Sequence, residues 1–69
     1  MLLERLGALL YGPEWQSPLA RALDVNLRTM QRWAAGIHQP PERLWGDIAA
    51  LLRERRIEID AALAELSRT

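Results

Sequence analysis

The chain contains no cysteine, and His38 is its only histidine. The first absence excludes disulfides and thiolate metal sites, and a lone histidine cannot assemble a metal site unaided. A chain of 69 residues buries only about 60% of the surface that its unfolded form exposes, so a monomer is expected to be marginally stable. We therefore expect one domain, no metal or other cofactor, and self-association as the remaining means of stabilisation.

Long apolar runs are also missing. Apolar runs such as Ala8 to Tyr11 are far shorter than the roughly 20 residues that cross a bilayer, and no stretch resembles a signal peptide. The sequence thus predicts a cytoplasmic protein with no membrane partner. Nine basic residues balance nine acidic ones, which differs from the strongly basic composition of many nucleic-acid binders.

The pattern of apolar residues and helix-ending residues predicts an all-α fold. Residues 1–11 form an expected first helix, ended by Gly12 and Pro13. A second helix is expected from Pro18 to about Leu23, with Ser17 as its N-cap. A third is expected over residues 27–35, capped by Asn26 and followed by Gly36. Trp15, Trp33 and Trp45 are assigned to the core.

The last helix is expected from about Pro41 to Leu66, because one apolar stripe continues along it without an internal proline. Two helices hinged near residues 56–58 are the alternative, since Ile57 lies off the stripe and nothing caps a junction there. The whole chain, residues 1–69, is accordingly predicted to be one compact domain of four to five helices with a long C-terminal helix.

Two short helices joined by a tight turn, the second with an N-cap and exposed arginines, are typical of a helix-turn-helix. The stretch QSPLARALDVNLRTMQRW, residues 16–33, resembles the helix-turn-helix of the lambda-repressor and Cro-like family of bacterial and phage regulators. Ala20, Val25, Met30 and Trp33 match its characteristic core positions. The resemblance extends over residues 6–52, with the motif itself at about 16–36. Asp24 departs from it, standing where the family most often has glycine.

The resemblance implies roles for individual side chains. Leu27, Arg28 and Arg32 fall where the recognition helix meets base edges in the major groove, and Gln31 shares their outer face. Arginine suits this role because its guanidinium donates two parallel hydrogen bonds to guanine. Phosphate contacts are expected from side chains before, within and after the motif: Gln16, Ser17, Thr29, His38, Gln39 and Arg43.

The distal half of the last helix carries an apolar stripe that has no obvious cover within the chain. Its members are Ile59, Ala62, Leu63 and Leu66. Together with the small size, this stripe indicates a homodimer contact, which Leu2, Leu3 and Leu6 could complete. The alternative is a monomer in which the segment folds back on the first helix.

The preferred hypothesis is sequence-specific binding of double-stranded DNA by a homodimeric transcriptional repressor, with autoregulation as one form of its action. Its two recognition helices would enter successive major grooves about 34 Å apart, so the operator would be an inverted repeat. The alternative is a protein-protein interaction module that keeps the fold without binding DNA, which the zero net charge favours. No nucleophile or pair of titratable groups indicates an enzyme, and no small-molecule ligand is expected.

Overall fold

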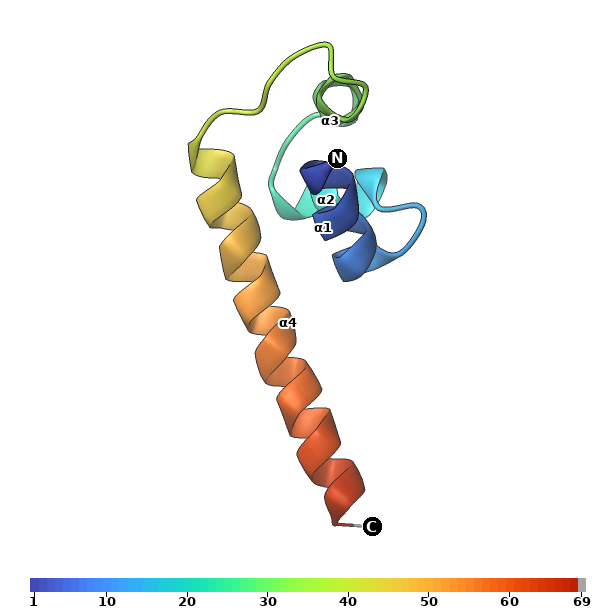
Figure 1. The fold of residues 1–69 in the computed structure, drawn as a ribbon, viewed down its shortest axis with the longest axis vertical. Coiled ribbons are helices and arrows are strands. Elements are labelled where there is room, and N and C mark those ends of the chain that lie inside the picture. Colours follow the sequence, from blue (N-terminus) through green and yellow to red (C-terminus); the bar gives the residue numbers. More distant parts are fainter. Residues whose placement is uncertain (69) are drawn as a thin grey trace.

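The computed structural model describes residues 1–68, which form four helices and no strand. The helices are α1 (Leu2–Tyr11), α2 (Gln16–Ala22), α3 (Leu27–Ala34) and α4 (Arg43–Ser67). Helices α1 to α3 gather beside the first half of α4, whose second half continues past them (Figure 1). The prediction of an all-helical fold with a long last helix is confirmed. Because residues 56–58 are helical without interruption, α4 is one helix rather than two.

Helix α2 begins two residues earlier than predicted. Its first residue is Gln16, Trp15 occupies the N-cap position, and no side chain caps the helix. The expectation that Ser17 is the cap and Pro18 the first residue is therefore wrong. Pro18 is tolerated at the third position because the N–H groups of a first helical turn have no partner within the helix.

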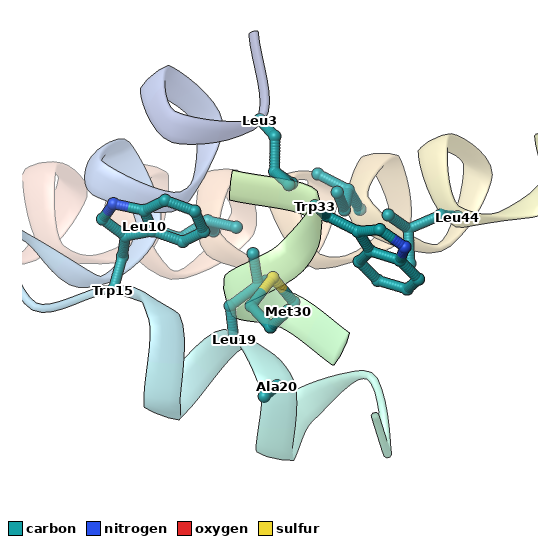
Figure 2. Packing of buried hydrophobic residues seen from close by; sticks show 9 residues of the cluster. Leu3, Leu10, Trp15, Leu19, Ala20, Met30, Trp33 and Leu44 are labelled. Atoms are coloured by element: carbon teal, nitrogen blue, oxygen red, sulfur yellow. The ribbon is translucent and has the colours of Figure 1, made fainter. Parts of the chain in front are cut away.

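The core draws on all four helices and on the α1–α2 connection, and it contains no buried polar or charged residue within the described chain. Leu19 and Met30 have no exposed surface. Trp15 and Trp33 lie at opposite sides of the cluster (Figure 2), and Trp45 is half-buried against it. The nine buried apolar residues are Leu3, Leu10, Trp15, Leu19, Ala20, Met30, Trp33, Leu44 and Ile48.

The described chain is elongated, measuring 48 × 23 × 20 Å with a radius of gyration of 13.9 Å. A compact domain of this length would have a radius of gyration of about 11 Å. The difference arises from α4, whose 25 residues span about 37 Å. We call residues 1–55 the body and residues 56–68 the projecting segment, in which every residue is exposed. The predicted compactness is thus not confirmed for the chain as a whole.

None of the helices within residues 1–68 combines the length and the apolar character needed to cross a membrane.

Candidate nucleic-acid interface

Helix α3 has one buried face and one exposed face. Met30 is fully buried, and Trp33 retains only 9% of its accessible surface. The outward positions are those that sequence reasoning selected for base contacts, and all four are exposed: Leu27, Arg28, Gln31 and Arg32. The structure therefore gathers them on one outer face of a helix that two core side chains hold in place. Their role as base contacts stays a prediction.

The short turn between α2 and α3 is built on Asp24. This residue is in the left-handed region with φ 56°, and it is the only non-glycine with positive φ among the described residues. The backbone N–H of Val25 donates to the carbonyl oxygen of Ala20 at 2.8 Å, and that of Asp24 donates to Arg21 at 3.2 Å. This pair of bonds is the Schellman arrangement, which satisfies carbonyl groups that the end of a helix leaves free. The turn thus sets the direction in which α3 leaves α2.

Both ends of α3 are fixed by local chemistry that the sequence indicated. At its start, the side-chain oxygen of Asn26 accepts from the backbone N–H of Arg28 at 2.8 Å. At its end, Gly36 has φ 78°, and the N–H of Ile37 donates to the carbonyl of Arg32 at 3.0 Å. A glycine at this position adopts positive φ without the steric cost that a Cβ brings. The cap and the glycine confine the helix to residues 27–34.

The guanidinium groups of Arg28 and Arg32 make no hydrogen bond or ion pair with any other residue in the described part of the chain. Each extends from an exposed position one helical turn from the other. All their donor groups are consequently available to an external acceptor. Asp24 and Glu14 are also exposed, and each adds a negative charge near α3 or the start of α2.

The candidate phosphate contacts fall into separate groups. Gln16 and Ser17 line a shallow depression of 370 Å³ together with Leu27 and Gln31 of α3, and Glu14 lines it as well. The structure thus brings the start of α2 and the outer face of α3 to one surface.

The remaining phosphate candidates lie elsewhere. His38 and Gln39 line a different groove of 540 Å³, where the connection after α3 faces Met1, Leu2 and the start of α4. Thr29 is half-buried, and Arg43 is the exposed first residue of α4. None of these four lines the depression beside α3.

The stripe predicted as a dimer contact is exposed along the projecting segment. Ile59 keeps 51% of its accessible surface, Leu63 57% and Leu66 70%, and Ala62 is also exposed. The segment does not fold back on α1, so the alternative of a monomer closed by this contact is wrong for the described chain.

The suggestion that Leu2, Leu3 and Leu6 complete this stripe is wrong. Leu2 and Leu3 lie with Trp45 near the start of α4, and Leu3 is buried in the core. The cause is the direction of α1, which runs parallel to α4, so that its last turn rather than its first lies nearest the projecting segment.

Two residues that sequence reasoning missed mark this boundary. Leu9 is 72% exposed and lines a groove of 240 Å³ with Leu52 and Ile59. Arg55 donates from its guanidinium to the carbonyl oxygen of Leu10 at 2.7 Å. A signal for Arg55 was present, because it lies three residues after Leu52 and four before Ile59, on the side of α4 that faces the body.

Residues 1–68 contain no cluster of three or more side chains able to hold a metal ion. Comparison of the chain with protein-family models, with curated proteins and with solved structures finds no match.

Proposed function

We propose that the protein binds double-stranded DNA in a sequence-specific manner, with α2 and α3 acting as a helix-turn-helix. In this proposal α3 enters the major groove, and Arg28 and Arg32 donate to base edges, while Leu27 and Gln31 contact neighbouring positions. The start of α2, at Gln16 and Ser17, approaches a phosphate.

The observation that carries the proposal concerns Arg28 and Arg32 on the outer face of α3. Neither guanidinium makes a hydrogen bond or ion pair within the described chain. Three further features support it: α3 is short, it is anchored by Met30 and Trp33, and its entry is fixed by the turn at Asp24. Between residues 16 and 39 the chain carries three arginines and one acidic residue, so the local charge is positive although the whole chain is neutral. A binder of this kind depends on few cations, and each is expected to matter.

As a regulator, the protein would act as a homodimeric repressor on an inverted repeat, since two copies related by a two-fold axis read two half-sites. Repression of this kind would follow protein concentration, as in autoregulation of its own promoter.

A titration of labelled DNA from the protein's own promoter region, at two salt concentrations, tests the proposal. We expect binding that weakens steeply with salt and is lost in folded Arg28→Ala and Arg32→Ala variants. Arg5→Ala is the matched control, because Arg5 is exposed on α1 and its replacement removes the same charge from a helix outside the α2–α3 pair. If no fragment binds better than random DNA at low salt, the proposal fails.

A protein-interaction module is the second candidate, favoured by the neutral net charge and by the exposed Glu14 and Asp24 beside α2 and α3. The same titration separates the two, since a module of this kind leaves every DNA fragment unbound.

A further inference from the structure

The projecting segment of α4 presents apolar side chains beyond the end of the body. Ile59, Leu63 and Leu66 are all more than half exposed, and Leu9 of α1 continues the same surface at 72%. Contiguous exposed apolar surface on a small protein marks a contact site, and long helices are stabilised mainly by burial of an apolar face. We propose that this surface binds a second copy of the chain, with the two projecting segments packed antiparallel.

The spacing of the stripe suits helix pairing. Leu52, Arg56, Ile59, Leu63 and Leu66 follow one another at alternating intervals of four and three residues. This is the spacing with which two helices interlock along a coiled-coil seam. The exposed part of the stripe begins where the body ends, because Leu52 is half-buried and residues 56–68 are all exposed.

Charge favours a second copy in the antiparallel direction. Residues 53–56 contain three arginines and one glutamate, whereas residues 57–66 contain three acidic residues and no basic one. Antiparallel packing places Arg56 of each helix opposite Leu66 of the other, next to the acidic Glu65. In a parallel pair, Arg56 would face Arg56 of the other copy across the seam, where like charges repel.

The position of the body also favours antiparallel packing. Leu9 and Leu10 of α1 line one groove with Arg56 and Ile59, so the stripe lies on the side of α4 that the body occupies. The hydrogen bond from Arg55 to Leu10 joins α1 to α4 on that side, immediately before the projecting segment begins. In a parallel pair, the part of the partner's α4 that precedes its projecting segment would overlap the space that α1 occupies. An antiparallel partner ends there, with its Leu66 beside Leu9.

This arrangement centres the pair between Ile59 and Leu63, near Ala61. Arg43, the first residue of α4, lies 18 residues before Ala61, so the two helix starts are about 54 Å apart along the pair at a rise of about 1.5 Å per residue. That distance exceeds the roughly 34 Å between successive major grooves. On the proposed DNA-binding function, on which this consequence alone rests, the two half-sites would lie more than one turn apart.

Sedimentation of the full chain at 5 to 100 μM, a range of about twentyfold around the affinity of a modest helix pair, tests the partner. We expect a dimer whose dissociation constant rises at least about tenfold in Leu63→Glu, since each dimer then buries two carboxylates. Ile57→Glu is the matched control: Ile57 is 68% exposed but lies off the stripe, so association should not change. A parent chain that stays monomeric, or equal effects of the two variants, would overturn the proposal.

Disulfide formation tests the direction, and the absence of native cysteine makes single substitutions unambiguous. In the antiparallel pair Arg56 of one copy faces Leu66 of the other, so a mixture of Arg56→Cys and Leu66→Cys chains should cross-link. Each variant alone should not, because its two thiols would lie about 15 Å apart along the helix, beyond disulfide reach. Cross-linking of Leu66→Cys alone, without the mixed product, indicates a parallel pair and overturns the inference.

The two proposals fail separately. A dimer that binds no DNA contradicts the DNA-binding function and leaves the antiparallel contact intact. A monomer that binds promoter DNA contradicts the antiparallel contact and leaves the DNA-binding function intact.

Discussion

The guanidinium of Arg55 donates to the carbonyl oxygen of Leu10 at 2.7 Å, although the two residues are 45 positions apart in sequence. The same group forms an ion pair with Glu58 at 3.3 Å and lies over the ring of Tyr11, 5.7 Å from its centroid. Leu10 is in the last turn of α1, where carbonyl groups have no partner within the helix and the helix dipole attracts a cation. One side chain therefore fastens the end of α1 to α4 where the projecting segment begins.

Replacing Arg55 with alanine should lower the free energy of unfolding by about 1 to 2 kcal/mol. The charged hydrogen bond to Leu10 supplies most of this loss, reduced because 39% of the Arg55 side chain is exposed to water. Urea denaturation measures it, and Arg53→Ala is the control, since Arg53 is exposed and its side chain makes no contact of this kind. Equal stability of the two variants would show that the contact contributes nothing.

Gly7 allows Trp15 to pack against α1. A Cβ built at Gly7 would lie 2.5 Å from Cδ2 and 3.0 Å from Cγ of the Trp15 ring, and real Cβ atoms do not approach so closely. Because Trp15 is 95% buried, the ring has little room to move. Gly7→Ala should therefore destabilise the protein by about 1 to 3 kcal/mol, despite the better helix propensity of alanine.

Gly46→Ala provides the matched comparison for that substitution. Gly46 is in the first turns of α4, and a Cβ there meets nothing within 4 Å. With no clash, alanine should stabilise the protein by up to about 1 kcal/mol through its helix propensity. Thermal unfolding of both variants should thus move the midpoint in opposite directions, and a fall in both would contradict this account.

The limits of α3 were predictable from sequence because Asn26 and Gly36 act on their own neighbours, through an N-cap and a left-handed residue. The start of α2 was not predictable, because the packing of Trp15 on Gly7 outweighs the local signal of Ser17 and Pro18. The same limit applies to the contacts at the end of the body. Arg55 meets a backbone carbonyl, which no side-chain pattern reveals, and the parallel direction of α1 is a property of the tertiary fold.

The exposed faces of α3 and α4 could be predicted because helical periodicity alone divides inward from outward positions. The way in which the phosphate candidates divide between separate surfaces could not be predicted. His38 and Gln39 line the groove between Leu2 and the end of α3, and not the depression that Gln16 and Ser17 line.

Removing the side chain of Asn26 should loosen the start of α3. Its oxygen satisfies the N–H of Arg28, which otherwise has no partner within the helix. Asn26→Ala should cost about 1 kcal/mol, whereas Asn26→Asp should be nearly neutral because a carboxylate also accepts this bond. Urea denaturation checks the order of the three proteins, and an alanine variant as stable as the aspartate variant would contradict it.

Asp24 affects both the stability of the α2–α3 turn and the charge near α3. With φ 56° it carries a conformational cost that glycine avoids, so Asp24→Gly should stabilise the protein by up to about 1 kcal/mol. Asp24→Asn separates the two effects, because asparagine tolerates the same conformation but lacks the carboxylate. If α3 binds DNA as proposed, both variants should bind promoter DNA about two- to fivefold more tightly at low salt, and the gain should shrink as salt screens the lost repulsion. An affinity that follows stability, rising in Asp24→Gly but not in Asp24→Asn, would mean that the turn's rigidity and not its charge limits binding.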